Sequence, residues 1–180
     1  GVRHDDHKAF GGHTVFAASA AFTPNAGNTV VRASFGEGFK APSLFQLYSD
    51  YGNAGLNPET SQSWDAGVTH RFLDGGVEVS ATYFHRDSKN LIAYIGCFGN
   101  NAAICVGRPF GTYDNVVLAS AKGAEIGLTL RPADGFVVAA NYTHTNARDE
   151  VTGNRLARRP ADVVNVNADY TLSYGLTVGL

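Results

Sequence analysis

Hydrophobic and polar residues alternate with a period of two along most of this chain, and no other feature of the sequence limits the fold so strongly. Between Trp64 and Phe72 every second residue is Trp, Ala, Val, His or Phe, and the residues between them are Asp, Gly, Thr and Arg. Similar segments lie at 77–84, 124–131, 136–143 and 163–172, with a less regular one at 91–95. Successive side chains of a β-strand point to opposite faces, so we predict about nine strands, each with an apolar face and a polar or small face.

The connections between the predicted strands are of two kinds, which take turns strictly along the chain. Tight connections, rich in the Gly, Asn, Asp and Pro that turns favour, lie at 24–28, 73–76, 132–135 and 173–175. Long connections lie at 38–59, 96–111 and 147–159. In an antiparallel sheet this order places the tight turns at one end and the long loops at the other, as in bacterial outer-membrane barrels. The sequence therefore predicts an all-β fold, an antiparallel transmembrane β-barrel.

A soluble β-sandwich is the alternative fold, because its strands alternate in the same way. Sandwich strands have about five or six residues, fewer than the segments here, and sandwich loops seldom sort by length so regularly. Aromatic residues near the ends of the predicted strands fit the interfacial girdles of a membrane barrel. They are Phe72, Tyr83, Phe136, Tyr142 and Tyr170. These features favour the membrane barrel.

The predicted interior face carries ionisable side chains. They are Asp65, Arg71, Glu78, Glu125, Arg131 and Asp169. In a small closed barrel these groups would be buried, at a cost of several kcal/mol each unless they were paired. In a large barrel they would line water and contact a plug. We therefore expect a wide barrel.

Charge and hydropathy argue against other classes of protein. The formal net charge is −2, without the clustered Lys and Arg that nucleic-acid binding requires. The longest apolar run, Val15 to Phe22 with one Ser in it, is much shorter than the ~20 residues of a spanning helix. The chain begins at Gly1, contains no Met and shows no leader, so we expect a fragment or a mature segment.

The two cysteines, Cys97 and Cys105, flank a short loop of Gly, Asn and Ala. In an oxidising compartment we expect them to form one local disulfide. Two free thiols are the alternative. A metal site is disfavoured, because neither His nor another Cys lies between them.

Two stretches resemble the barrel of TonB-dependent outer-membrane receptors. Residues 32–48 read Arg-Ala-Ser-Phe-Gly-Glu-Gly-Phe-Lys-Ala-Pro-Ser-Leu-Phe-Gln-Leu-Tyr, and residues 52–64 read Gly-Asn-Ala-Gly-Leu-Asn-Pro-Glu-Thr-Ser-Gln-Ser-Trp. In that family a strand reaches the cell surface through Gly-Phe-Lys/Arg-Ala-Pro, and Leu-x-Pro-Glu precedes the next strand. The resemblance extends through 83–92, 121–125 and 156–160. Its wording at Phe39–Leu44, Gln46–Tyr48, Asp87–Ile92 and Leu156–Arg159 is most similar to the cobalamin-receptor branch, although siderophore receptors share much of it.

The resemblance implies a barrel of 22 strands, closed by an N-terminal plug that carries the box pulled by TonB. Residues 1–180 contain neither plug nor box and stop at Leu180 in mid-strand, so we expect a partial barrel domain without the plug domain and C-terminal strands. The implied function is active transport of a large scarce ligand, cobalamin first, across the outer membrane of a Gram-negative bacterium. A siderophore receptor of the same family and a passive porin or adhesin barrel are the alternatives. The implied partners are membrane lipid, lipopolysaccharide, the TonB complex through the plug, and cobalamin or a ferric siderophore. No cofactor is implied.

Candidate ligand contacts lie in the long loops. Tyr48, Tyr51 and Asn53 would offer aromatic and hydrogen-bonding surface to a corrin or a siderophore, whereas the alternative is packing between loops. Cobalamin receptors resemble the chain at Leu-x-Arg-Arg, which implies that Arg158 lies near the ligand, where its guanidinium would donate several hydrogen bonds. A salt bridge at the rim is the alternative for Arg158 and the preferred interpretation for Arg159.

Two further patterns invite other functions. His4-Asp5-Asp6-His7 gathers metal-binding side chains, but in a strand they point alternately to both faces, so we predict no metal site. An enzyme would need a nucleophile with its base and acid, and Ser80 and Ser120 are isolated serines without a nucleophile-elbow pattern. We therefore expect no catalytic activity.

Overall fold

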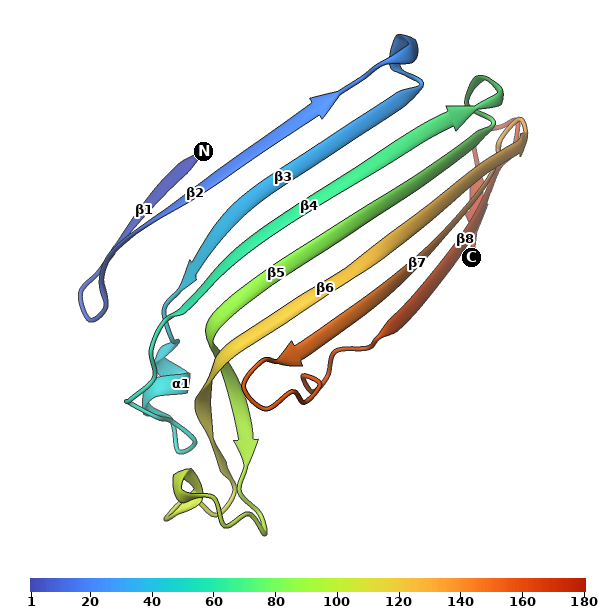
Figure 1. The fold of residues 1–180 in the computed structure, drawn as a ribbon. Helices are drawn as coiled ribbons and strands as arrows, with labels where there is room; N and C mark the ends of the chain where they lie inside the picture. The colour runs from blue at the N-terminus through green and yellow to red at the C-terminus, as the bar shows by residue number, and fades with distance from the viewer.

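The computed structural model describes residues 1–180 as a single antiparallel sheet of nine strands, each hydrogen-bonded to its neighbours in the sequence. The strands are β1 (Val2–His7), β2 (Gly11–Phe22), β3 (Thr29–Lys40), β4 (Glu59–Phe72), β5 (Val77–Gly96), β6 (Gly111–Ala133), β7 (Phe136–Asp149), β8 (Asp162–Thr171) and β9 (Thr177–Gly179). One α-helix, α1 (Leu44–Tyr48), and three 3-10 turns, η1 (Asn25–Gly27), η2 (Leu73–Gly75) and η3 (Ala103–Cys105), lie between them. Figure 1 shows a curved single layer, like a segment of a barrel wall. The predicted all-β, antiparallel fold is confirmed.

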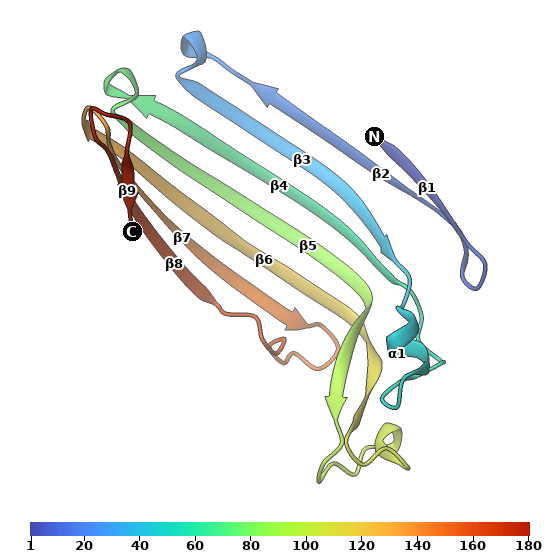
Figure 2. The same ribbon diagram turned by 180° about the vertical axis from the view of Figure 1, so that it is seen from behind.

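The connections sort by length at the two ends of the sheet, with one exception. Both views place η1, η2 and the β6–β7 and β8–β9 turns at one end, and α1 with the long loops at the other (Figures 1 and 2). The exception is the β1–β2 turn, where Phe10 N–H donates to His7 O across three residues at the loop end. The strict alternation of tight and long connections predicted from the sequence is therefore wrong at this point. Strand β2 begins with Gly11-Gly12-His13-Thr14, which shows no apolar–polar pattern.

The tight turns of η1 and η2 share one backbone geometry. Two successive residues, Asn25-Ala26 and Leu73-Asp74, have φ between 51° and 57°, and the Gly that follows each pair has φ near 91°. Left-handed values match the right-handed twist of the flanking strands and allow a close connection. Gly27 and Gly75 take such values without the steric cost that a Cβ would add.

Register aligns the apolar residues of neighbouring strands on the outer face of the curved sheet. One row joins Val31, Val68, Ala81, Ile126, Tyr142 and Val164. These side chains do not pack against a second layer: Val68 is 41% exposed, Ile126 53% and Val164 66%. Only 11 of 180 residues are buried, which rules out the dry core on which a soluble sandwich depends. An apolar face of this extent requires apolar surroundings.

The opposite, inner face is polar, and many of its side chains bond to one another across the strands. Arg32 Nη2 donates to Thr82 Oγ1 at 3.0 Å, and Arg71 Nε lies 2.7 Å from Glu78 Oε2. Ser34 donates to Asp65, and Asn165 donates to Asn141 Oδ1 at 2.9 Å. The predicted division into apolar and polar faces is therefore confirmed. Charged and polar side chains carry no burial cost on a face that water reaches.

Aromatic residues mark where the outer face stops being apolar near the loop end, and they step diagonally across the register. Trp64 on β4 is in register with His85 on β5, Lys122 on β6 and Asn146 on β7. The aromatic residue of β7 nearest the loop end is Tyr142, four residues before Asn146. The step of four residues measures about 13 Å along the strand, and the three strand spacings measure about 14 Å across the sheet. If both rings lie at the same height in the membrane, the strands are tilted by about 40° from the membrane normal. Transmembrane barrels tilt their strands by about 35–45°.

The aromatic residues at the turn end step in the same direction. Phe22 on β2 is in register with Val68 through Val31, and the aromatic residue of β4, Phe72, comes four residues later. On β4 the two boundaries, Trp64 and Phe72, are about 27 Å apart along the strand, or about 20 Å along the membrane normal at this tilt. The apolar band of an outer-membrane barrel is about 25 Å high. No helix of this chain has the length and apolar character needed to cross a membrane.

Candidate ligand-binding surface at the loop end of the sheet

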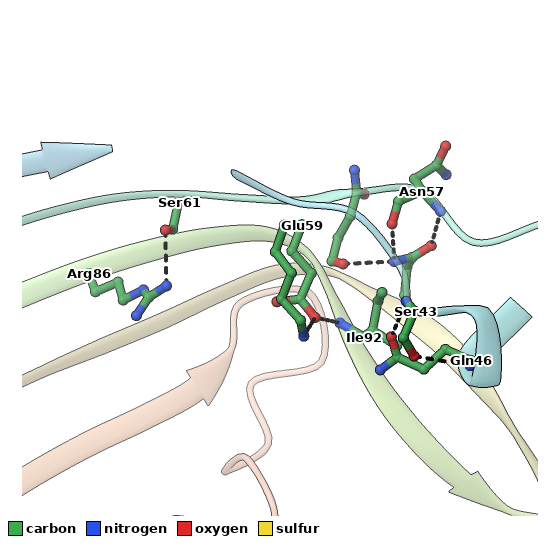
Figure 3. Close-up of polar contacts among 10 residues, drawn as sticks. Ser43, Gln46, Asn57, Glu59, Ser61, Arg86 and Ile92 are labelled. Carbon is green, nitrogen blue, oxygen red and sulfur yellow. Dashed lines mark hydrogen bonds and ion pairs between the residues drawn. The ribbon is translucent and has the colours of Figure 1, made fainter. Parts of the chain in front are cut away.

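The β3–β4 loop, residues 41–58, contains α1 and holds it with side chains of its own. Ser43 Oγ accepts from Gln46 N–H at 3.2 Å, while Gln46 Oε1 accepts from Ser43 N–H at 2.9 Å (Figure 3). This reciprocal pair is a capping box, which compensates a helix of five residues for its few internal bonds. Only Leu47 of the helix is buried, so Tyr48 points to the outside with 72% of its surface exposed.

Strands β5 and β6 continue beyond the rest of the sheet as an arm, made of residues 91–96 and 111–116. Both views show β5 bending sharply where the arm begins (Figures 1 and 2). Asn90 lies at this position with φ +56°, and it is left out of the otherwise continuous β5–β6 pairing. Asn takes left-handed φ more readily than most residues, which accounts for the bend at this position.

The tip of the arm is closed by the disulfide that the sequence predicts. Cys97 and Cys105 are bonded, with their Cα atoms 5.3 Å apart, and no cysteine of the chain is free. Both are buried, whereas Phe98, Val106 and Phe110 beside them expose 94%, 82% and 71% of their surface. The disulfide therefore supports a tip that presents apolar side chains outward.

The arm and the β3–β4 loop pack against each other. Tyr51 O accepts from Thr112 Oγ1 at 3.1 Å and from Tyr113 N–H at 3.3 Å, and Asn53 Nδ2 donates to Tyr113 O at 3.0 Å. Thr112 is completely buried as a result. Rings from both segments meet edge to face, the favoured arrangement of aromatic pairs: Tyr94 lies 6.2 Å from Tyr51 and 5.6 Å from Tyr113, which lies 6.3 Å from Phe45. We call Phe45, Tyr51, Tyr94 and Tyr113 the aromatic cluster.

The structure places the predicted loop residues in different surroundings. Tyr48 and Tyr51 are exposed, at 72% and 38%, beside or within the aromatic cluster. The amide of Asn53 is used within the protein, because its Nδ2 donates to Tyr113 O and its Oδ1 accepts from Gly55 N–H. The sequence interpretation missed Tyr94 and Tyr113, whose only signal was an aromatic residue near each end of a long connection.

Arg158 lies in a second loop, residues 150–161 between β7 and β8. Its φ is +58° and it is exposed, and the ion pairs of the structure include neither Arg158 nor Arg159. The arm lies between this β7–β8 loop and α1 in both views, so the structure does not bring Arg158 together with Tyr48, Tyr51 and Asn53 (Figures 1 and 2). The salt bridge considered for the two arginines is absent.

The β7–β8 loop is held by bonds to its own strands. Asp149 Oδ1 accepts from Val151 N–H and Thr152 N–H, and these bonds hold the pKa of this carboxyl, seven residues beyond Tyr142 and outside the apolar band, below its usual value. Leu156 N–H donates to Ala147 O, and Thr145 N–H donates to Ala161 O. The loop therefore rests on β7 and leaves Arg158 and Arg159 without an ion pair.

The segment His4–His7 forms most of β1, and its polar contacts are local. His4 Nδ1 lies 2.8 Å from Thr14 Oγ1, and Asp5 Oδ2 lies 2.8 Å from Arg3 Nε. Beyond the aromatic boundary, a groove of about 700 Å³ runs across β2 to β6. Its carboxylates have partners: Glu37 accepts from Gln62 and Asp87 pairs with His85.

Comparisons with known proteins agree with this arrangement. Residues 1–180 match the family described as "TonB dependent receptor-like, beta-barrel". The chain is similar to a solved structure of a mutant ferric enterobactin receptor, PfeA, from Pseudomonas aeruginosa, with 25% identity and a TM-score of 0.76 over 99% of this chain and 28% of that one. The P. aeruginosa pyoverdine receptor FpvA is 26% identical, with a TM-score of 0.65, over 94% of this chain and 22% of that one.

The siderophore receptor PirA of P. aeruginosa shares the fold, with a TM-score of 0.76 and 23% identity over 99% of this chain. The chain spans 35% of the length of PirA and 28% of that of PfeA. The comparison is therefore with one part of each relative.

Proposed function

The chain belongs to the TonB-dependent receptor-like β-barrel family, and from this premise we propose that it is part of an outer-membrane transporter that takes up a ferric siderophore. The named relatives are receptors for enterobactin, pyoverdine and siderophores. They support the siderophore alternative in place of cobalamin, which the sequence placed first. The sequence placed cobalamin first on the wording of motifs such as Phe39–Leu44 and Leu156–Arg159, much of which the resemblance also gives to siderophore receptors.

The observation that carries this proposal is that the loop end presents exposed aromatic rings on one side of the arm and Arg158, which has no ion pair, on the other side. Ferric complexes of catecholate siderophores are anionic and present aromatic rings. The aromatic cluster with Tyr48 offers ring faces and edges, and Arg158 offers a guanidinium group that no carboxylate neutralises. Arg recognises anions and also stacks on aromatic rings, so both kinds of group suit such a ligand.

The inner face supports the transport part of the proposal. A polar groove of about 430 Å³ crosses it and is lined by Arg32, Glu78, Thr82 and Glu125, among others. We propose that this face surrounds a plug domain, and that the TonB complex acts through that plug to release the ligand. Residues 1–180 would then be a partial barrel domain that supplies the wall and part of the binding surface.

The outer face supports the proposed lipid partners. Its apolar band between the two aromatic boundaries suits hydrocarbon. Beyond the boundary near the loop end it becomes polar at Glu37, Gln62, His85 and Lys122, which suits the headgroups of outer-membrane lipid, including lipopolysaccharide. A passive porin would show the same two faces, so the experiment has to test the ligand.

Binding of ferric enterobactin and of cyanocobalamin to the intact receptor, measured by titration calorimetry, tests the proposal. We expect ferric enterobactin to bind and cyanocobalamin not to bind. Substitution Arg158→Ala should weaken binding at least about tenfold, because a charged hydrogen bond contributes about 1.5–3 kcal/mol. Arg159→Ala is the matched control and should have a smaller effect.

Three outcomes would contradict parts of the account. Binding of cyanocobalamin alone would return the protein to the cobalamin branch. An unchanged affinity of the Arg158→Ala variant would remove Arg158 from the binding surface. Passage of small solutes through the receptor in vesicles, without binding of either ligand, would support a porin.

A further inference from the structure

We propose that Asn115 and Glu59 are positioning residues that fasten the arm to the β3–β4 loop, so that the aromatic cluster is assembled before a ligand arrives. Two rings of the cluster, Phe45 and Tyr51, come from the loop, and the other two, Tyr94 and Tyr113, come from the arm. Their mutual geometry therefore depends on how these two segments are held. The consequence for ligand affinity rests on the proposed function, whereas the fastening itself does not.

Asn115 fastens the arm through three hydrogen bonds of its side-chain amide. Its Oδ1 accepts from Asn57 N–H at 2.8 Å, and its Nδ2 donates to Asn57 O at 3.1 Å and to Asn90 O at 2.7 Å. The amide bonds to both the backbone N–H and the backbone C=O of Asn57. In a sheet these two groups would bond to the backbone of a neighbouring strand. The amide also holds the backbone of the bend at Asn90, so one amide joins the loop, the arm and the hinge between arm and sheet.

Glu59 fastens the same bend from the sheet. Its Oε1 accepts from Ile92 N–H at 3.1 Å and lies 3.0 Å from Lys40 Nζ (Figure 3). The side chain of Glu59 is 16% exposed and that of Lys40 is 60% exposed, so the bond from Glu59 to the backbone is the better shielded of the two. Ile92 is the register partner of Asn115, which places the two fastenings at one level of the arm.

Nearby contacts show that the fastened position is a packed one. Leu56 is 3% exposed and Thr112 is fully buried at the junction, although most of the chain is exposed. The β7–β8 loop makes no corresponding bond to the arm tip or to α1. Because one amide makes the bonds to both Asn57 and Asn90, removing its donors should free the loop and the bend together.

Spin-label distances in the intact receptor test the fastening without any ligand. Labels on Ala54→Cys and Val106→Cys place one probe on the β3–β4 loop and one at the tip of the arm, with the native disulfide retained. We expect one narrow distance distribution, and a broad one after Asn115→Asp, which keeps size and acceptor but puts oxygen against the carbonyls of Asn57 and Asn90. The matched control is Asn141→Asp, because Asn141 Oδ1 accepts from Asn165 and keeps that role.

The conservative variant separates positioning by Glu59 from its charge. Glu59→Gln retains an oxygen that accepts from Ile92 N–H and should leave the distribution narrow, whereas Glu59→Leu should broaden it.

With ferric enterobactin as the probe, Asn115→Asp should weaken binding about tenfold, mainly through slower association, because an unfastened surface must be ordered on binding.

Narrow distributions in both Asn115→Asp and Glu59→Leu would overturn the proposal. Broad distributions with unchanged affinity for ferric enterobactin would overturn the positioning role. A wild-type receptor that does not bind ferric enterobactin would contradict the proposed function instead, and the spin-label distances would still decide whether the two residues fasten the arm.

Discussion

The body of the sheet and its loop end are built by different rules. In the body, neighbouring residues such as Leu128 and Thr129 face different surroundings, and large apolar side chains remain exposed on one side. At the loop end side chains bond to the backbone of other segments and a small core forms. The buried residues of the chain lie there or in the adjoining parts of β6 and β7: Pro42, Leu47, Leu56, Cys97, Cys105, Gly111, Thr112, Ala119, Ser120, Gly123 and Ala147.

The difference teaches where stability originates in each region. The body gains little from internal burial and depends on the hydrocarbon that its outer face meets. The loop end stands in water, so it has to supply its own disulfide, capping box and side-chain bonds. Substitutions should therefore act through lipid in the body and through specific contacts at the loop end.

The largest effect is expected from a charge on the outer face of the body. Leu128→Arg should destabilise the receptor folded in lipid vesicles by about 2–4 kcal/mol, because arginine near the bilayer midplane costs that amount. Unfolding in guanidinium, followed by tryptophan fluorescence, measures the change. Thr129→Arg is the matched control on the inner face, next to Glu78, and should change stability little. Equal losses in both variants would erase the distinction between the faces.

A smaller and local effect is expected from the disulfide of the arm tip. Replacing Cys97 and Cys105 together by Ser should reduce the local stability of residues 97–105 by about 2 kcal/mol, since the cross-link restricts the opened tip. Hydrogen exchange of the tip should accelerate, while exchange in the body of β4 to β7 stays unchanged. Faster exchange in the body as well would show that the two regions are coupled.

The smallest effect is expected at the bend between the two regions. Asn90→Ala should cost about 1 kcal/mol, because a left-handed φ is unfavourable for a residue with a Cβ and no local polar group. Asn90→Gly is the control for backbone geometry and should cost less, although it too loses the side-chain amide. Protease cleavage within residues 91–116 reports how often the arm opens. Greater opening in the Gly variant than in the Ala variant would refute the account of the bend.

The sequence predicted the body well because two solvents impose a period of two on every strand. The segments 64–72, 124–131 and 136–143 lie within β4, β6 and β7 with the predicted faces. The β1–β2 hairpin was not predicted as a short turn at the loop end, since its strand β2 begins with Gly-Gly and shows no alternation there.

The sequence predicted less of the loop end, where contacts join residues far apart in the chain. The disulfide followed from two cysteines in a short loop. The pairing of Asn57 with Asn115, 58 residues apart, leaves no local pattern, because any exposed Asn would look the same. The left-handed φ of Asn90 had a weak signal in its residue type, but one Asn among several does not single out a bend.

The central claim is that odd and even positions of the spanning strands meet different solvents, and spin labels on β6 test it most directly. Single labels placed in turn from Ala124 to Arg131 in the receptor in vesicles report access to oxygen, which concentrates in lipid, and to a water-soluble nickel chelate. Oxygen access should be high at the apolar positions and nickel access high at the polar or small ones. The apolar positions are Ala124, Ile126, Leu128 and Leu130, and the others are Glu125, Gly127, Thr129 and Arg131. Uniform access along the segment, or low access to both reagents at the apolar positions, would contradict the account.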